Sequence, residues 1–185
     1  EGHLLSPFAC PKNFQFSMVR QALRPRAQGR VAHHFQFPIL ALVASGGTTQ
    51  LILVKKIGDY KVIAKTQDDA LGEALDKAAR MLGLGYPGGA ILEKFARQGD
   101  PNSYPLPIPM AGKEDRLEFS FSGIKTAMYK LVEKEKPLTS KKIYNLAATF
   151  QDRTFQHVER IIKKILGKYS FKEFFLAGGV ASNIE

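Results

Sequence analysis

The sequence predicts a mixed α/β fold whose strands lead into two glycine-rich corners. The first observation is the stretch 39–64, where three short apolar runs are separated by turns that contain glycine. The second is a change to helical spacing of the apolar residues over residues 69–84. The third is a later apolar run, residues 174–177, which again ends in a pair of glycines. Strands and helices that follow one another in this way are typical of an α/β domain.

Residues 39–44 and 51–54 are β-rich runs that meet at Ser45-Gly46-Gly47-Thr48-Thr49. Because glycine takes a positive φ without steric cost, this corner predicts a tight hairpin. Gly58-Asp59 predicts a second hairpin, which leads into a strand over residues 60–64. The first corner is rich in N–H groups and hydroxyls and therefore suggests a phosphate- or nucleotide-holding edge, although a plain turn is the alternative.

Three helical regions follow from apolar spacing. They are a helix over residues 69–84, a short helix over residues 90–98, and a long helix or helix pair over residues 138–168. The prolines between residues 101 and 109 predict extended coil over residues 103–110.

Residues 119–123 alternate in polarity and then turn. Ser122 is well placed to act as the N-cap of a helix over residues 123–136, because a serine hydroxyl accepts hydrogen bonds from first-turn N–H groups. The first turn of this helix would then offer free N–H groups to an anion.

The second glycine corner follows the strand at residues 174–177. Gly178 and Gly179 would let the backbone approach a ligand closely, and Asn183 would lie in the first turn of the next helix. Two such corners, far apart in the sequence and each behind an apolar strand, suggest two lobes that close on one nucleotide. This is the organisation of an actin/Hsp70-type (ASKHA) domain.

Composition and charge narrow the class of protein. The 185 residues carry 27 Lys and Arg against 17 Asp and Glu, a formal charge of +10, which favours a polyanionic partner or a strongly solvated surface. The single cysteine, Cys10, excludes an internal disulfide framework. No run approaches the roughly 18 apolar residues of a membrane span, and no signal-peptide pattern opens the sequence, so we expect a cytoplasmic protein.

The segment 10–34 is basic and contains no acidic residue. Its arginines, interleaved with phenylalanines, are suited to contact a nucleic-acid backbone and to stack on bases. A basic loop without a partner is the alternative. The arginines are Arg20, Arg24, Arg26 and Arg30.

Six motifs, in this order, resemble the TsaD family, the bacterial catalytic subunits that make threonylcarbamoyladenosine in tRNA, formerly called Gcp or O-sialoglycoprotein endopeptidase. The motifs are Glu1-Gly2-His3-Leu4-Leu5-Ser6-Pro7, Val43-Ala44-Ser45-Gly46-Gly47-Thr48-Thr49-Gln50, Asp68-Asp69-Ala70 with Gly72-Glu73-Ala74-Leu75-Asp76-Lys77, Tyr86-Pro87-Gly88-Gly89, Phe119-Ser120-Phe121-Ser122-Gly123 and Ala177-Gly178-Gly179-Val180-Ala181-Ser182-Asn183.

The resemblance implies an actin/Hsp70-like fold of two α/β lobes, of which this chain holds a part. It also implies transfer of a threonylcarbamoyl group from threonylcarbamoyl-AMP to N6 of adenosine 37, in tRNAs that read codons beginning with A. The implied partners are tRNA and the subunits TsaB and TsaE. A non-catalytic nucleotide-binding scaffold subunit of the same fold is the alternative.

The motif match also assigns residues to the site. His3 matches the second histidine of the family's His-x-x-x-His pair and would bind one divalent metal ion, iron or zinc. The substrate-binding residues that the match implies are Val43, Ala44, Ser45, Gly46, Gly47, Asp76, Gly89 and Asn183. No side-chain nucleophile is expected, because the amine of adenosine attacks directly.

The sequence departs from the family pattern in four places. Thr48 stands where the family usually has histidine, and the link from Pro7 to Phe37 is longer and more basic than usual. The first metal histidine and the metal aspartate would lie beyond Glu1 and Glu185, so we expect a fragment that is inactive alone. A zinc protease is disfavoured, because Glu1 and His3 do not have the spacing of His-Glu-x-x-His. The expected organisation is a metal-bearing helix end with a basic linker over residues 1–36, followed by the α/β region over residues 37–185.

Overall fold

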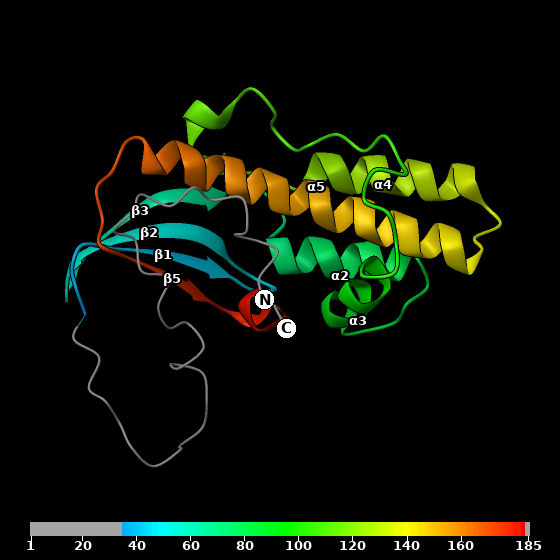
Figure 1. Cartoon of the computed structure of the whole chain (residues 1–185), viewed down its shortest axis with the longest axis horizontal. Coiled ribbons are helices and arrows are strands. Elements are labelled where there is room, and N and C mark those ends of the chain that lie inside the picture. The colour runs from blue at the N-terminus through cyan, green and yellow to red at the C-terminus, as the bar shows by residue number, and fades with distance from the viewer. Residues whose placement is uncertain (1–34, 184–185) are drawn as a thin grey trace, which may run out of the picture.

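The computed structural model describes residues 35–183, which form one five-stranded sheet and four α-helices (Figure 1). The elements in chain order are β1 (Ile39–Ala44), β2 (Thr49–Lys56), β3 (Asp59–Thr66), α2 (Leu71–Met81), α3 (Gly88–Ala96), the 3₁₀ helix η1 (Glu114–Arg116), β4 (Glu118–Phe119), α4 (Ser122–Glu135), α5 (Ser140–Leu166), β5 (Glu173–Ala177) and the 3₁₀ helix η2 (Gly179–Asn183).

The sheet has the strand order β4-β3-β2-β1-β5. The predicted hairpins are confirmed, because β1, β2 and β3 pair antiparallel in sequence, with Ala44 opposite Thr49 at the first corner. β5 pairs parallel to β1, with Val43 opposite Ala177. Since the carboxyl ends of parallel neighbours meet at one edge of a sheet, both glycine corners lie side by side there. The described residues thus place the two corners on one sheet rather than on facing lobes.

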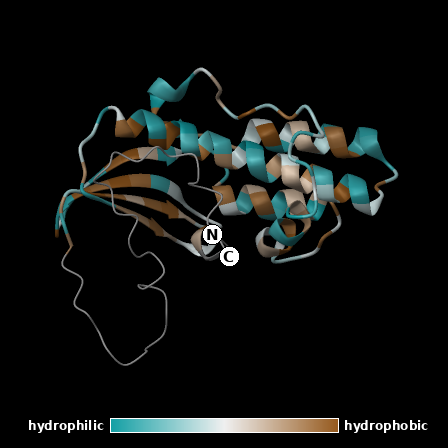
Figure 2. Ribbon diagram, in the orientation of Figure 1, coloured by the Kyte–Doolittle hydropathy of each residue, from teal (hydrophilic) through white to brown (hydrophobic). Residues whose placement is uncertain are grey.

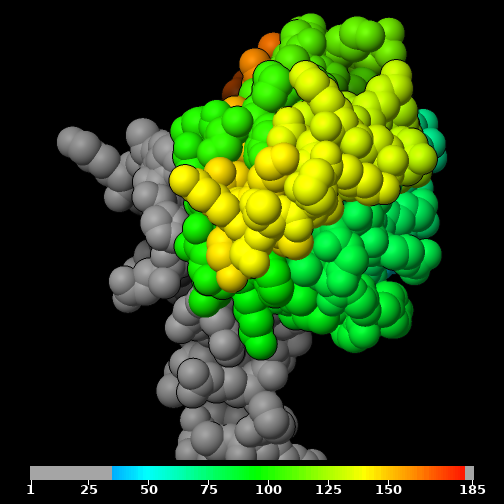
Figure 3. Space-filling view, turned by 90° about the vertical axis from the view of Figure 1, so that its right-hand side faces the viewer, coloured from blue at the N-terminus to red at the C-terminus, as the bar shows by residue number. Residues whose placement is uncertain are grey.

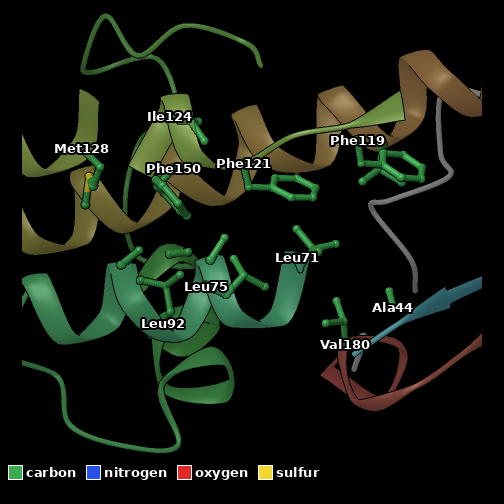
Figure 4. Packing of buried hydrophobic residues seen from close by; sticks show 14 of the residues in the cluster. Ala44, Leu71, Leu75, Leu92, Phe119, Phe121, Ile124, Met128, Phe150 and Val180 are labelled. Atoms are coloured by element: carbon green, nitrogen blue, oxygen red, sulfur yellow. The ribbon is translucent and has the colours of Figure 1, made fainter. Parts of the chain in front are cut away.

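The long helix α5 joins the sheet to the other helices (Figure 1). Its C-terminal half passes over the strands and its N-terminal half lies along α2, α3 and α4. Hydrophobic residues, coloured brown in Figure 2, run along the strands and recur along the helices. In the resulting core, Phe150 of α5 and Phe121, just before α4, face Leu75 and Leu71 of α2 (Figure 4).

The predicted elements differ from the observed ones mainly at their ends. The helix expected over residues 69–84 begins at Leu71, and the one expected over residues 90–98 begins at Gly88. The long helix or helix pair expected over residues 138–168 is the single helix α5, Ser140–Leu166, and its N-terminal part (yellow) faces the viewer in Figure 3. No regular strand or helix occupies residues 103–110, in agreement with the proline pattern.

Some predictions lie outside the described residues. They are the metal-bearing helix end with His3, the basic segment 10–34, and therefore the division of the chain at residues 36 and 37. Within residues 35–183, no helix combines the length and the apolar character needed to cross a bilayer.

Candidate substrate site at the glycine corners

The first corner is a closed turn built around Ser45. The N–H of Ser45 donates to the carbonyl oxygen of Thr48 at 2.8 Å, and Ser45 Oγ accepts from the N–H groups of Thr48 and Gly47 at 3.1 and 3.3 Å. Thr48 closes the turn through backbone atoms, so the turn itself does not require the histidine that the family usually has there. A Cβ at Gly46 or Gly47 would meet no atom of residues 35–183 within 4 Å, so no described residue covers this face of the corner.

The corner is fastened to the first turn of α2. The N–H of Gly72 donates to the carbonyl oxygen of Ser45 at 3.1 Å, and the N–H of Leu71 donates to the buried Oγ1 of Thr49 at 2.7 Å. Ala70, the N-cap residue of α2, has no side-chain cap, so Thr49 and Ser45 supply the acceptors that the helix start needs.

The second corner packs directly on the end of β1. Gly178 has a φ of 102°, and a Cβ there would lie 2.2 Å from the carbonyl oxygen of Ala44, so only glycine fits. Val180, two residues later, lies against Ala44 (Figure 4). The short helix η2, which ends at Asn183, also contacts α2 and α3.

Asp76 and Gly89 are brought together between α2 and α3. Asp76 Oδ1 accepts a hydrogen bond from the N–H of Gly89 at 2.8 Å. This approach depends on Gly88, because a Cβ at that position would lie 2.5 Å from the Cβ of Ala79. The carboxylate of Asp76 therefore sits at the start of α3, on the helix pair that borders η2.

The structure brings the predicted substrate residues that it describes together in two neighbouring groups, one at the edge of the sheet and one on α2 and α3, both of which contact η2. Val43 and Ala44 end β1, the residues from Ser45 to Gly47 form the turn, and Asp76 and Gly89 join two neighbouring helices. Asn183 is the last residue of η2.

Asp68 caps the N-terminus of α4 from a distant segment, the link between β3 and α2. Its Oδ1 accepts from the N–H groups of Phe121 and Ser122 at 2.7 and 3.3 Å. Its Oδ2 accepts from the hydroxyls of Ser120 and Ser122 at 2.5 and 2.6 Å. The prediction that Ser122 is the N-cap is wrong, since α4 begins at Ser122 and its hydroxyl donates to Asp68 instead. The anion expected at this helix start is the carboxylate of Asp68.

Asp69 bridges α2 and α4. Its Oδ1 contacts Nζ of Lys77 at 2.8 Å and its Oδ2 contacts Nζ of Lys125 at 2.5 Å. Burial acts to raise the pKa of both Asp68 and Asp69, but the donors around each carboxylate outweigh it and hold each pKa below its usual value. Both side chains are therefore charged at neutral pH.

His157 of α5 packs against residues 119–121 as a buried, neutral side chain. Its Nε2 accepts from the N–H of Ser120 at 3.3 Å, and its ring meets Phe119 and Phe121 edge-on at centroid distances of 5.7 and 5.6 Å. Burial lowers the pKa of His157 to about 4. Its surroundings make it a core residue that supports the start of α4.

The described residues do not form a metal site. Across residues 35–183, no three His, Cys, Asp or Glu side chains are grouped as ligands. His3, the predicted ligand, lies outside the described residues, so its role stays a prediction.

The comparisons with known proteins agree with the resemblance. A family model described as "TsaD: tRNA N6-adenosine threonylcarbamoyltransferase" matches residues 19–185. The chain belongs to the TsaD family. The family has the actin/Hsp70-like fold, and the observed α/β sheet with its helices is a part of it.

Curated relatives carry the same name as the family model. A tRNA N6-adenosine threonylcarbamoyltransferase of Agrobacterium fabrum is 45% identical over 168 residues, which cover 84% of this chain and 45% of the relative. Those of Rhizobium etli and Brucella ovis are 42% and 44% identical over 168 and 162 residues, covering 84% and 83% of this chain and 45% of each relative. The chain spans about half the length of the curated relatives that it matches.

Several residues that shape the site were not assigned from the sequence. They are Thr49, Asp68, Asp69, Gly72 and His157. Two aspartates directly before a helical pattern predict a cap on the helix that follows them, which is α2. The structure shows Asp68 capping α4 instead. No local pattern connects residues that are more than fifty positions apart.

Proposed function

We propose that the full-length gene product is a tRNA N6-adenosine threonylcarbamoyltransferase. It transfers the threonylcarbamoyl group from threonylcarbamoyl-AMP to N6 of adenosine 37 in tRNAs that read codons beginning with A. The observation that supports the proposal is that the Ser45 turn and η2 lie side by side at one edge of the sheet, next to the helices α2 and α3 that carry Asp76 and Gly89, in a chain of the TsaD family.

The corner is suited to hold the reacting end of an acyl-adenylate. The N–H of Gly46 has no partner within residues 35–183, and the Ser45 hydroxyl can still donate, because its contacts with Gly47 and Thr48 use Oγ as an acceptor. These groups are offered to the phosphate or carbonyl oxygen. We assign the ribose and adenine to Asp76 and Gly89, and the completion of the adenosine pocket to Asn183.

In the transfer, the N6 amine attacks the carbonyl carbon of the threonylcarbamoyl group. A C–N bond forms, the bond from that carbon to the phosphate oxygen breaks, the amine loses a proton, and AMP leaves. No side-chain nucleophile takes part. Catalysis then rests on holding the two substrates together and on stabilising the charge that develops on the carbonyl oxygen.

The remaining assignments rest on the family. One divalent metal ion, iron or zinc, is implied, with His3 as a ligand and Lewis-acid and template chemistry as its contribution. Because the described residues hold no donor set for it, no step is assigned to this ion. tRNA, the subunits TsaB and TsaE, and a cytoplasmic location are proposed on the same ground. No observation favours the non-catalytic scaffold over the enzyme.

The test uses the full-length gene product with TsaB, TsaE, threonylcarbamoyl-AMP and unmodified tRNA. Mass spectrometry of the digested tRNA is expected to find threonylcarbamoyladenosine at position 37. If a relative modifies the same tRNA in parallel and this protein does not, the proposal is wrong. Binding of threonylcarbamoyl-AMP without transfer would favour the scaffold.

A further inference from the structure

We propose that Asp68 and Asp69 are positioning residues of the substrate corner: they fasten the starts of α2 and α4 to each other, and α2 in turn fixes the turn at Ser45. The inference rests on the proposed function only for the identity of the ligand. The contacts that carry it run from α4 through the two carboxylates to the corner.

The first contact is the cap on α4. The N-cap residue Phe121 offers no side-chain hydrogen bond, so Asp68 provides the acceptor for the N–H groups of Phe121 and Ser122. A charged acceptor at a helix N-terminus makes strong hydrogen bonds and also interacts favourably with the helix dipole. The start of α4 is therefore held at the link before α2.

The second contact joins the two helices. Asp69 pairs with Lys77, in the second turn of α2, and with Lys125, in the first turn of α4. The side chain of Asp69 is only 15% exposed, so water screens these pairs less than it would a surface pair. Thr66 Oγ1 donates to the carbonyl oxygen of Asp69 at 2.8 Å and fixes the backbone that carries both carboxylates.

The third contact passes from α2 to the corner. Leu71 and Gly72, directly after this link, donate to Thr49 and Ser45. A Cβ at Gly72 would lie 2.7 Å from the carbonyl carbon and oxygen of Ser45, so the helix start touches the turn with no space between them. A shift of the first turn of α2 must therefore move the turn at Ser45.

Neither carboxylate is free to bind a ligand itself. Both oxygens of Asp68 accept from residues 120–122, and both oxygens of Asp69 face lysines. Lys77 and Lys125 offset the charge of Asp69, whereas the charge of Asp68 is stabilised by four uncharged N–H and O–H donors. Their effect on the ligand is exerted through the position of the corner.

The test compares two probes on the full-length protein, AMP and adenosine, by calorimetric titration. The corner is assigned to the phosphate, and Asp76 with Gly89 to the nucleoside. Asp68→Asn and Asp69→Asn are therefore expected to weaken AMP binding by about tenfold, the scale of one charge-assisted hydrogen bond, while adenosine binding stays within about twofold. In the transfer assay, KM for threonylcarbamoyl-AMP is expected to rise by a similar factor, with KM for tRNA unchanged.

Two further variants separate position from stability. Asp115→Asn also removes a carboxylate that pairs with two lysines, Lys164 and Lys168, but at the C-terminal end of α5. It is expected to change neither the affinity for AMP nor the affinity for adenosine. Asp69→Glu keeps the charge between Lys77 and Lys125 and is expected to restore most of the AMP affinity that Asp69→Asn loses. Should the asparagine variants not fold, Lys125→Gln removes only one arm of the bridge and is tested in the same way.

The inference is overturned if Asp68→Asn and Asp69→Asn, or Lys125→Gln in their place, lower the melting temperature but leave the ratio of AMP to adenosine affinity at the wild-type value. It is also overturned if Asp115→Asn changes that ratio equally. A wild-type protein that binds AMP but modifies no tRNA would refute the proposed function and leave this comparison intact.

Discussion

The N–H of Gly72 donates to the carbonyl oxygen of Ser45 at 3.1 Å, and this contact leaves no room for a side chain at residue 72. Gly72→Ala would place a Cβ 2.7 Å from backbone atoms of Ser45, and backbone on both sides gives way only by distortion. We expect a loss of about 1–3 kcal/mol in the free energy of unfolding, the usual cost of overpacking. Urea unfolding of the full-length protein measures this loss.

Gly123→Ala is the matched control, since Gly123 is also the second residue of its helix. A Cβ there would meet no described residue within 4 Å, so the substitution is expected to be neutral or to stabilise by up to ~1 kcal/mol. Equal losses for both variants would mean that the contact between Gly72 and Ser45 is looser than described.

Asp76 supplies the second prediction. Asp76→Asn keeps an oxygen that can accept from the N–H of Gly89 but removes the charge, so the melting temperature is expected to stay close to that of the wild type. If the same carboxylate holds the ribose, KM for threonylcarbamoyl-AMP is expected to rise by about tenfold, the cost of weakening one hydrogen bond to a charged group. Steady-state kinetics with saturating tRNA checks this.

Asp59→Asn serves as the control for Asp76, because Asp59 begins β3 at the hairpin with β2, away from the glycine corners. Its KM should equal that of the wild type. An unchanged KM in Asp76→Asn would remove Asp76 from the proposed pocket.

Local sequence patterns predicted the corner well because its cause is local. The short apolar runs and the Gly-Gly and Gly-Asp turns are sufficient to indicate β1, β2 and β3. Gly58 takes the positive φ expected at its turn, but Gly46 and Gly47 do not, and the hydrogen bonds to Ser45 Oγ close that turn instead. The strand 174–177 was equally clear. The parallel pairing of this strand with β1 could not be predicted, because strands more than one hundred residues apart carry no sequence signal of their pairing.

The N-cap prediction for Ser122 failed for the same reason, a contact with a residue far away in the sequence. Serine before a helix is a good N-cap by local rules, yet here a carboxylate from residue 68 takes the helix N–H groups and turns the hydroxyl into a donor. Only the folded chain places Asp68 there. Likewise, Asp76 and Gly89 came from motif resemblance, and their hydrogen bond could not be read from spacing alone.

His157 supplies a prediction on pH. Burial, the dominant cause, lowers its pKa to about 4, with smaller effects from Glu114, Arg160 and Asp68. An unfolded histidine has a pKa of about 6.5, so below that pH the unfolded chain binds a proton that the folded chain rejects. The stabilisation is complete above pH ~6.5 and falls as the pH drops toward 4. Between about pH 7.5 and pH 5 the free energy of unfolding should decrease by about 2 kcal/mol from this residue.

Urea unfolding of His157→Gln at the same two pH values isolates the effect. Glutamine does not titrate and can still accept from the N–H of Ser120, so most of this pH dependence should vanish. Asp68 and Asp69, whose pKa values lie below the usual 3.8, lose their contribution only at lower pH. A variant with the full wild-type slope would assign the pH dependence to other groups.

The basic segment 10–34, which lies outside the described residues, gives the last prediction. Neutralising Arg20, Arg24, Arg26 and Arg30 together is expected to weaken tRNA binding and to flatten its salt dependence, because each lost phosphate contact lowers the slope of log K against log salt by about 0.7–0.9. The control removes the same charge from four exposed lysines on the helices that have no ion pair with any of the residues 35–183: Lys94, Lys130, Lys134 and Lys141. Filter binding of tRNA over a range of salt concentrations measures both slopes. A similar loss in both variants would indicate a general effect of net charge, whereas a loss confined to the arginine variant would make this segment a tRNA contact.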